Sequence, residues 1–329
     1  MGGACVAVDG GQSKVLVRVS GVAQPIAVEG LGRLEGDLAE GLISRIHSAL
    51  SGLQGGVPRI RRMVLGLTTM PATEPERLDL ARRIAEAFSA AEVYLGGDAL
   101  TAHAGAFGGA AGVVLTVGTG VACLGFDPAT GDIRRVDGDG FLLGDTGAAF
   151  WIGSRGIEAV LRAADGRGGP TALSRACVLR FGEHAELAAH LHSLPRAVSA
   201  IAGFAVDVQA AAQSGDTVAR AIIAEAADEL VHTAWAASAV MTTRPVHLAL
   251  SGRVVAPGTA LRAAIEARLR TEPHLVIVSA EGDPLDGAWA LVADLGGGAR
   301  GSAGQLRAGS STAALWAAYD RHMTGWSLQ

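Results

Sequence analysis

The stretch 113–136, VVLTVGTGVACLGFDPATGDIRRV, contains three short runs with the composition of β-strands, at Val113–Val117, Val121–Asp127 and Ile133–Val136. Valine and isoleucine, which pack well on a pleated surface, recur in these runs, and glycine-containing turns separate them. The stretch therefore predicts three consecutive strands joined by tight turns.

The first half of the chain begins with the same pattern, at Cys5–Asp9, Val15–Ser20 and Pro25–Glu29. After each group of strands, the spacing of apolar residues predicts a helix, a strand, a helix, a strand and a helix. In the second copy, extra helices are expected between about residues 148 and 241. A plan that occurs twice is better evidence than any single strand, because errors in element boundaries do not produce a repeat. The sequence thus predicts an α/β protein with a duplicated domain.

The small-residue stretch 104–112, AGAFGGAAG, is the expected border between the copies, because such residues allow a hinge. We expect a first domain over 1–108 and a second domain, with the extra helices, over 109–295. The remainder, 296–329, begins as a linker rich in Gly, Ser and Arg. It ends in a predicted short amphipathic helix, Thr312–Met323, which could pack back on the first domain.

Composition excludes several classes of protein. With 49% hydrophobic and 18% charged residues among 329, the chain has ample material for buried cores and does not resemble a disordered protein. Its net charge of -5, without a basic cluster, argues against binding to nucleic acid or to an anionic membrane. No apolar run approaches the length of a membrane span, and no leader pattern is recognised at residues 1–9, so we expect a cytoplasmic protein. The three cysteines lie too far apart in the sequence to indicate a disulfide framework or a metal-ligand set.

The first two strand runs are joined by Asp9–Lys14, DGGQSK. Adjacent glycines let a ligand approach the backbone, and successive N–H groups in such a turn can bind an anion. Ser13 adds a hydroxyl donor, and Lys14, the only lysine of the chain, adds a positive charge suited to a phosphate. Asp9 could hold a magnesium ion through water. An ordinary hairpin turn is the alternative interpretation.

The corresponding turn of the second copy is Gly118-Thr119-Gly120, which offers backbone N–H groups and a hydroxyl with little steric bulk. Two such hairpins facing each other across a cleft could hold a triphosphate from both sides. Neither turn matches the P-loop pattern GxxxxGK[ST] or the dinucleotide-binding pattern GxGxxG, so those folds are disfavoured.

Asp98 follows two glycines at a predicted strand-to-helix junction. A carboxylate at this place could project into an interdomain cleft and accept a proton from a substrate hydroxyl. Aspartate is also a preferred residue at the N-cap of a helix, which is the alternative explanation for its position.

The segment Asp137–Gly147, DGDGFLLGDTG, is a glycine-dense loop whose spacing does not fit a calcium-binding loop. Asp139 and Asp145 suit the recognition of a polyol, because one carboxylate can accept two hydroxyl groups. A solvated loop with Asp145 as a helix cap is the alternative. Later in the chain, Ser251 and Gly252 end a predicted strand, where small residues let a flat ring lie against the backbone. A plain turn explains this pair equally well.

Together these segments resemble the BadF/BadG/BcrA/BcrD-type ATPase family and, within it, the N-acetylglucosamine kinase branch. That family belongs to the superfamily of sugar kinases, actin and heat-shock chaperone ATPases. The resemblance covers about residues 4–295, and its most specific part is GDGFLLGDTGAAFWIGSRGIEAVL at 138–161. The other matching segments lie at 9–14, 117–120, 203–230 and 283–291.

The resemblance implies two duplicated ribonuclease-H-like domains around a cleft, with ATP held between the two hairpins, a magnesium ion near Asp9 and Asp98 as the catalytic base. It also implies a homodimer. The expected nucleotide-binding residues are Asp9, Gly10, Gly11, Gln12, Ser13, Lys14, Gly118, Thr119, Gly120, Ser251 and Gly252. The expected substrate-binding residues are Asp98, Gly138, Asp139, Asp145, Arg33 and Thr68.

The chain departs from the family pattern in the expected sugar pocket. Sugar kinases of the family place an asparagine near Gly30–Gly32, and this chain contains no asparagine. Asp139 stands where an aromatic residue is usual, Thr146 where a glutamate is usual, and the turn after the fourth strand contains Thr68. An anionic Asp139 would favour an amino sugar, whereas Arg33 would favour an acidic one.

The expected function is therefore transfer of the γ-phosphoryl group of ATP to a hydroxyl of an amino or N-acetylated hexose. Because the hairpins are closer to the family pattern than the sugar pocket is, phosphoryl transfer is expected, whereas the sequence does not specify which sugar is the acceptor. A non-catalytic, ATP-dependent sensor of the same fold is the alternative.

Overall fold

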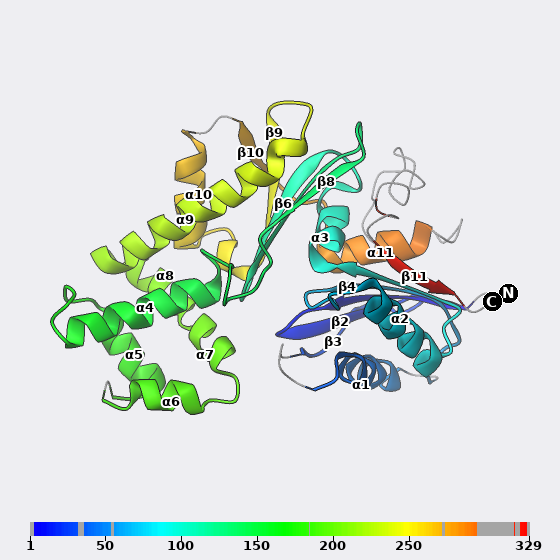
Figure 1. Cartoon of the computed structure of the whole chain (residues 1–329), viewed down its shortest axis with the longest axis horizontal. Coiled ribbons are helices and arrows are strands. Elements are labelled where there is room, and N and C mark those ends of the chain that lie inside the picture. Colours follow the sequence, from blue (N-terminus) through cyan, green and yellow to red (C-terminus); the bar gives the residue numbers. More distant parts are fainter. Residues whose placement is uncertain are drawn as a thin grey trace. The chain divides into compact units, whose positions relative to one another are not determined.

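The structure is a computed structural model, and it forms two compact units (Figure 1). Unit 1 consists of Met1–Ala111, Pro128–Gly131 and Ala280–Gln329, and unit 2 of Gly112–Asp127 and Asp132–Ser279. The structure describes residues 3–31, 36–53, 56–183, 185–271, 274–294, 319 and 323–327.

Unit 1 is built on a six-stranded mixed sheet with the order β11-β5-β4-β1-β2-β3. Strands β1 and β2 and strands β2 and β3 pair antiparallel, whereas β4 pairs parallel with both β1 and β5. The strands are β1 (Ala4–Gly10), β2 (Lys14–Val19), β3 (Ile26–Glu29), β4 (Ile60–Leu67), β5 (Glu92–Gly97) and β11 (Thr324–Ser327).

Helices cover both faces of this sheet: α1 and α2 lie on one face, and α3 and α11 on the other (Figure 1). This arrangement explains why β4 is buried at nearly every position, whereas the outer strand β3 alternates between half-buried and exposed residues. The helices are α1 (Leu38–Ser51), α2 (Glu74–Phe88), α3 (Asp98–Phe107) and α11 (Pro284–Asp294).

Unit 2 repeats the plan with a five-stranded sheet of order β10-β9-β6-β7-β8. Its β6, β7 and β8 pair antiparallel in succession, and β9 pairs parallel with β6 and β10, as β4 does with β1 and β5 in unit 1. The predicted duplication of a ribonuclease-H-like α/β plan is confirmed. The strands are β6 (Gly112–Val117), β7 (Val121–Asp127), β8 (Asp132–Val136), β9 (Val246–Ser251) and β10 (Leu275–Val278).

The extra helices of unit 2 lie between β8 and β9, as expected. The long helix α9 packs on β6, β7 and β8, and α10 packs on α9. The helices are α4 (Ala149–Ala164), α5 (Leu173–Phe181), α6 (Leu187–Ser193), α7 (Ala197–Gly203), α8 (Ala205–Gln213), α9 (Thr217–Ala237) and α10 (Ala260–Leu269), with 3₁₀ turns at Ser238–Val240 and Arg253–Val255.

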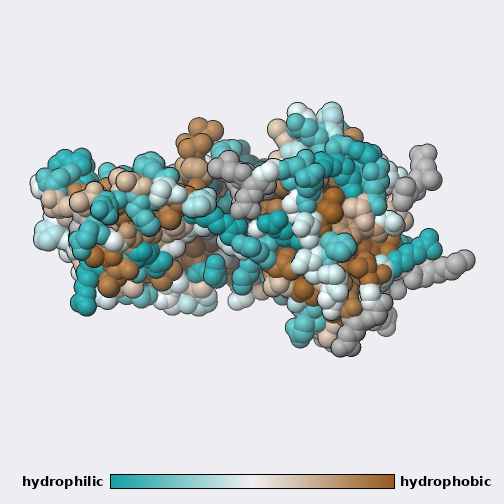
Figure 2. Space-filling model, turned by 90° about the horizontal axis from the view of Figure 1, so that it is seen from below, coloured by the Kyte–Doolittle hydropathy of each residue, from teal (hydrophilic) through white to brown (hydrophobic). Residues whose placement is uncertain are grey.

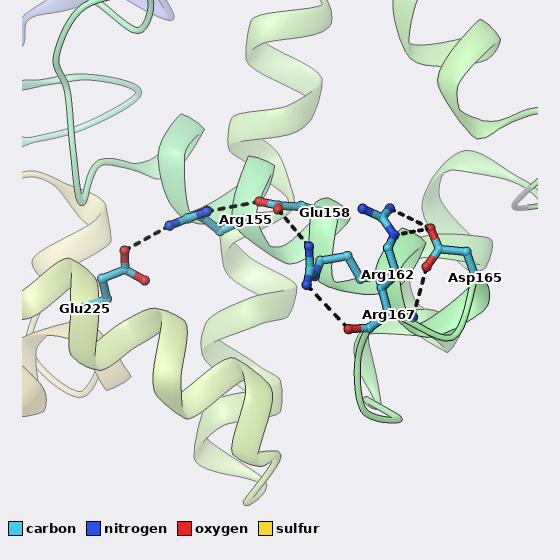
Figure 3. A network of polar contacts seen from close by, with 6 residues as sticks. All are labelled: Arg155, Glu158, Arg162, Asp165, Arg167 and Glu225. Atoms are coloured by element: carbon cyan, nitrogen blue, oxygen red, sulfur yellow. Dashed lines mark hydrogen bonds and ion pairs between the residues drawn. The ribbon is translucent and has the colours of Figure 1, made fainter.

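Helix α4 is held mainly by apolar packing and close backbone contact. At Gly153 an added Cβ would lie 1.9 Å from the carbonyl oxygen of Ile201, so α4 and α7 approach closely only because this residue is glycine. Polar contacts follow the outer side of α4, where Arg155 bonds to Glu158 and, across to α9, to Glu225 (Figure 3). Such exposed ion pairs each contribute about 0–1 kcal/mol.

The structure differs from the sequence-based prediction at several places. Helix α11, which lies within the range expected for the second domain, belongs to unit 1. Among the extra helices, the pattern of apolar residues predicts one helix over Arg196–Gln213, but the structure divides it into α7 and α8, which meet at Phe204. Most of the helix expected over Thr312–Met323 lies outside the described residues, but Met323 leads directly into β11, a strand that the sequence analysis did not predict.

Apolar groups are interspersed with hydrophilic residues on the face seen in Figure 2. Two neighbouring leucines of the loop before α4, Leu142 and Leu143, are 80% and 87% exposed. Among the described residues, the longest helices lack the combination of length and apolar character required to cross a bilayer.

Helices α3 and α11 of unit 1 cross with their backbones in contact. A Cβ added at Gly287 would lie 1.9 Å from the carbonyl oxygen of Thr101 and 2.5 Å from the backbone nitrogen of Gly105. A Cβ added at Gly105 would in turn lie 2.0 Å from the carbonyl oxygen of Asp283. Neither side of the contact can yield without moving a helix, so the two glycines fix how α11 lies on α3.

We expect Gly287→Ala to lower the free energy of unfolding by about 2–4 kcal/mol, because overpacking against backbone atoms cannot be relieved by a rotamer change. Gly41→Ala in α1 is the matched control: the added Cβ would meet only Cδ2 of Leu31, the end of a flexible side chain. That variant should change stability by less than about 1 kcal/mol. Urea unfolding of both variants tests the difference, and equal losses would contradict it.

Candidate active site

The ends of two parallel-running strands bring Asp9 and Asp98 together. Strand β1 ends just after Asp9, and β5, which runs in the same direction on the far side of β4, ends just before Asp98. Burial raises the pKa of Asp9 to about 7, and the negative charges of Asp98 and Asp283 contribute to that shift. The end of the sheet therefore holds a group of carboxylates with a strongly negative local potential.

Asp98 is the first residue of α3 and not its N-cap. Gly97 occupies the N-cap position, where no side chain can satisfy the free N–H groups of the helix. A carboxylate in the first turn is still favourable to the helix dipole, by about 0.3–1 kcal/mol. The capping explanation considered for Asp98 is thus wrong, since the cap is supplied by its neighbour.

Asp283 is a third carboxylate of this group, and the sequence analysis did not assign it to the site. It precedes α11, where its Oδ1 accepts from the N–H of Asp286 at 2.8 Å, while its own N–H donates to Asp286 Oδ2 at 3.1 Å. Desolvation by the surrounding protein raises its pKa, and the charge of Asp286 adds to the effect. In the sequence, Asp283 stands in a segment that resembles the family, 283–291, at the start of a predicted helix, but neither signal relates it to Asp9.

The β1–β2 turn is a compact backbone structure. The N–H of Gly11 donates to the carbonyl of Lys14 at 3.0 Å, and the N–H of Leu31 donates to the carbonyl of Gly11 at 3.3 Å. Ser13 and Lys14 are exposed, and Gly11 and Gln12 are half-buried. The turn therefore presents a hydroxyl and an ammonium group to its surroundings while its backbone is held in place.

Two neighbouring segments of unit 1 support this turn. The N–H of Gly30 donates to the carbonyl of Ser13, and a Cβ added at Gly30 would lie 2.4 Å from the carbonyl oxygen of Gln12. The N–H of Thr68 donates to the carbonyl of Gly10 at 3.2 Å, which places Thr68 beside the start of the turn. Gly30 is therefore needed for the end of β3 to pass so closely beneath the turn.

The β6–β7 turn of unit 2 is held by the start of α4. The N–H groups of Ala149 and Phe150 donate to the carbonyls of Gly118 and Thr119, at 3.0 and 3.1 Å. These N–H groups belong to the first turn of a helix, where they lack partners within the helix. Because the turn's carbonyls face the helix, the turn and α4 form one unit of backbone structure.

Asp145 also supports this turn. Its carboxylate is buried, and Oδ1 accepts from the N–H of Val121 at 3.0 Å. A Cβ added at Gly120 would lie 2.5 Å from Asp145 Oδ2, so only glycine permits this contact. Asp137 in turn accepts from the N–H of Asp145 at 2.9 Å and from that of Gly138 at 2.8 Å.

The loop before α4 thus carries backbone strain that these bonds offset. Asp137 and Asp145 both have a positive φ, 63° and 60°, which is uncommon for residues other than glycine. The capping role considered for Asp145 is not observed, because the N-cap of α4 is Ala148. Asp139 is exposed on the same loop.

Gly252 follows the end of β9 with a φ of 106°. A Cβ added there would lie 2.1 Å from the carbonyl oxygen of Val117, the last residue of β6. The preceding residue, Ser251, pairs with Thr116 across the parallel strands. Gly252 and the β6–β7 turn are therefore packed together at one end of the sheet of unit 2.

Within each unit, the structure brings most of the predicted site residues together. In unit 1 these are the turn 9–14, Thr68 and Asp98, and in unit 2 the turn 118–120, Asp145, Ser251 and Gly252. Arg33 lies outside the described residues. Among the described residues, no three histidine, cysteine or acidic side chains form a group that could enclose a metal ion.

Comparisons with known proteins agree with this fold. A curated relative, an N-acetylmuramic acid/N-acetylglucosamine kinase of Clostridium acetobutylicum, is 26% identical over 263 residues, which is 76% of this chain and 85% of the relative. A solved structure of a candidate N-acetylglucosamine kinase from Chromobacterium violaceum is 25% identical, with a TM-score of 0.67, and the match covers 87% of this chain and 97% of that one.

More distant structures share the fold. A glucokinase of the ROK family from Streptomyces griseus, solved with glucose and AMPPNP, has a TM-score of 0.58 at 16% identity, and the match covers 88% of this chain and 99% of the other. The model of one family, described as the BadF/BadG/BcrA/BcrD ATPase family, matches residues 5–293. The chain is therefore a member of the BadF/BadG/BcrA/BcrD ATPase family, built on the two-unit fold of the sugar kinases.

Proposed function

We propose that this protein is an ATP-dependent carbohydrate kinase that transfers the γ-phosphoryl group of ATP to a hydroxyl of an amino or N-acetylated hexose. The family is an ATPase family, and both the curated relative and the structure from Chromobacterium violaceum are named for N-acetylglucosamine. The two-unit fold and the turns at the ends of both sheets support the same class of reaction.

The observation that carries the proposal is the pair Asp9 and Asp98 at the carboxyl end of the unit 1 sheet. As the acceptor hydroxyl attacks phosphorus, Asp98 takes up its proton, a new oxygen–phosphorus bond forms, and the bond to the leaving ADP breaks. A carboxylate is a strong enough base for this step, because the hydroxyl becomes more acidic as its oxygen begins to bond to phosphorus.

The described carboxylates fit a magnesium ion that is bound together with a nucleotide. Burial raises the pKa of Asp9, and the negative charges of Asp98 and Asp283 add to the shift, so a cation beside Asp9 would be favoured electrostatically. Magnesium in such sites usually keeps several waters and takes one or two carboxylates plus phosphate oxygens. When bound, it would neutralise phosphate charge, and Asp9 would hold it directly or through water.

The backbone turns and their neighbours supply the nucleotide-binding groups of the proposal. In unit 1, Gly10, Gly11 and Gln12 offer main-chain groups beside the Ser13 hydroxyl and the Lys14 ammonium. In unit 2, Gly118, Thr119 and Gly120 offer the same kind of main-chain surface, and Ser251 and Gly252 leave room for a flat base. This assignment is supported by the glycines whose Cβ atoms would clash with their neighbours.

Sugar recognition is assigned to Asp98, Thr68 and, in unit 2, to the loop of Gly138, Asp139 and Asp145. Asp145 lies buried on this loop beside the β6–β7 turn, and its carboxylate is proposed to accept a sugar hydroxyl. The exposed Asp139 favours a sugar with an ammonium group over one with a carboxylate.

Asp98→Asn should lower kcat by at least about 10²-fold, because asparagine cannot accept the proton, and it should leave the Kd for ATP within about threefold. Asp79→Asn is the matched control: Asp79 is an exposed carboxylate of α2 paired with Arg82, and its loss should not change kcat. Steady-state kinetics on a panel of amino, N-acetylated and acidic hexoses, with calorimetry for ATP, provide the measurement. ATP binding without turnover on any sugar would instead favour the non-catalytic sensor.

Lys14 can be probed chemically because it is the only lysine of the chain. An amine-reactive ester should modify Lys14, which is exposed, and ATP with Mg²⁺ should slow that modification at least about fivefold by pairing the ammonium with phosphate. Peptide mass spectrometry follows the reaction, and adenosine, which lacks phosphates, serves as the matched control. Equal rates with and without ATP would contradict a phosphate contact at Lys14.

The raised pKa of Asp9 predicts a pH-dependent cost in stability without ligands. The folded state keeps the proton of Asp9 up to about pH 7, whereas the unfolded chain loses it near its ordinary pKa of 3.8. Stability therefore falls between those pH values and the cost is complete above pH 7. Asp9→Asn should be more stable than the wild type at pH 8, by at most about 4 kcal/mol, and the difference should shrink towards pH 4.

Urea unfolding from pH 4 to pH 8 measures that difference for Asp9→Asn. A difference that does not change with pH would contradict the raised pKa of Asp9 in the folded protein. Adding Mg²⁺ with ATP at pH 8 should raise the Tm of the wild type more than that of the variant.

A further inference from the structure

The described residues near the C-terminus, Tyr319 and Met323–Ser327, are here called the C-terminal segment. It lies beyond the region matched by the family model, which ends at residue 293. Strand β11 of this segment nevertheless forms the outer strand of the unit 1 sheet, directly beside β5. Strand β5, which leads to Asp98, is therefore paired on one side with residues that lie outside the family match.

The pairing of β11 with β5 extends along most of β5. Thr324 lies opposite Leu95 and Ser327 opposite Glu92, in antiparallel register. At Gly325, an added Cβ would lie 2.8 Å from Cε1 of Tyr94, so the ring of Tyr94 passes directly over this glycine. Trp326 packs against the hydrophobic core of unit 1, and α2 covers the strand.

Beyond the paired residues, the segment also contacts the junction between β5 and α3. The side chain of Met323 lies beside Gly96: a Cβ built on that glycine would be 3.5 Å from Met323 Cε. Two residues later, Asp98 begins α3. Met323 therefore packs where the chain turns from strand to helix.

Tyr319 fixes the helix on the other side of Asp98. Its hydroxyl forms a 2.6 Å hydrogen bond with Nδ1 of His103, and neither residue is exposed to solvent. The two rings meet edge to face, and His103 also packs on Phe107. A buried hydrogen bond of this kind fixes orientation, because losing either partner leaves the other buried without its bond.

We propose that the C-terminal segment is a positioning element for Asp98, with β11 and Met323 holding β5 and Tyr319 holding α3. This inference rests on the proposed role of Asp98. Asp98 lies between the two elements that the segment contacts, so its carboxylate moves when either element shifts. Because phosphoryl transfer requires the base and the hydroxyl to be aligned, a displacement of about 1 Å can cost about 10²-fold in rate.

Tyr319→Phe and Gly325→Val test the proposal by removing the hydroxyl and by forcing the strand away from Tyr94. Both should lower kcat, Tyr319→Phe by about 5- to 30-fold, while the KM for ATP stays within about twofold, since β5 and β4 separate β11 from β1, the strand that leads to the turn 9–14. Ser327→Ala, in the same strand but with an exposed side chain, is the matched control and should leave kcat unchanged. Hydrogen exchange of Glu92–Leu95 should accelerate in Gly325→Val but not in Ser327→Ala.

A double-mutant cycle separates positioning from a merely structural role. If the segment acts through Asp98, Tyr319→Phe should change kcat less than about twofold when Asp98→Asn is already present. An equal loss in both backgrounds, or full kcat in folded Tyr319→Phe, would overturn the inference while leaving the proposed kinase function intact. Full activity of Asp98→Asn itself would contradict the proposed function and, with it, this inference. Should Gly325→Val fail to fold, Tyr319→Phe alone decides.

Discussion

The site in unit 1 depends on one buried carboxylate, Asp9, which the fold holds close to two others, Asp98 and Asp283. Parallel strands β1, β4 and β5 end at the same edge, so a residue placed at the end of β1 and another just beyond β5 become neighbours. The folded protein tolerates this arrangement because Asp9 can keep its proton near neutral pH. A site that stores unfavourable charge in this way is well suited to a cation and to a polyphosphate that arrives with one.

In unit 2 the corresponding turn is held in part by side-chain carboxylates that accept hydrogen bonds from backbone N–H groups. Asp145 accepts from Val121, and Asp137 accepts from Asp145, so the loop before α4 and the β6–β7 turn hold each other in place. Both aspartates adopt left-handed backbone conformations that cost free energy, and the buried bonds offset that cost. The Asp145 carboxylate thus supports the turn from within the loop before α4.

Much of this fold could be predicted from the sequence, because the duplicated order of strands and turns is a local pattern. The turns at 9–14 and 118–120 were predicted for the same reason, because their glycines and their hydroxyl and amino side chains are neighbours in the sequence. The contribution of Asp283 could not be found in this way, since its effect on Asp9 arises from tertiary packing and not from its neighbours in the sequence. Strand β11 was missed because Thr324–Ser327 is short, contains a glycine and pairs with a strand more than two hundred residues away. An N-cap role was the alternative for Asp98 because residue preferences favour aspartate there, whereas Gly97 occupies that position.

The position of β11 also bears on how the chain avoids self-association while it folds. Until β11 is in place, β5 is an outer strand whose backbone N–H and C=O groups on one side have no partners in the sheet. An uncovered strand rich in Val, Tyr and Leu is a template on which other chains can add, and so a starting point for aggregation. The last described strand of the chain covers that edge. A folding intermediate in which β11 is not yet paired would therefore be the species most prone to aggregate and to bind chaperones.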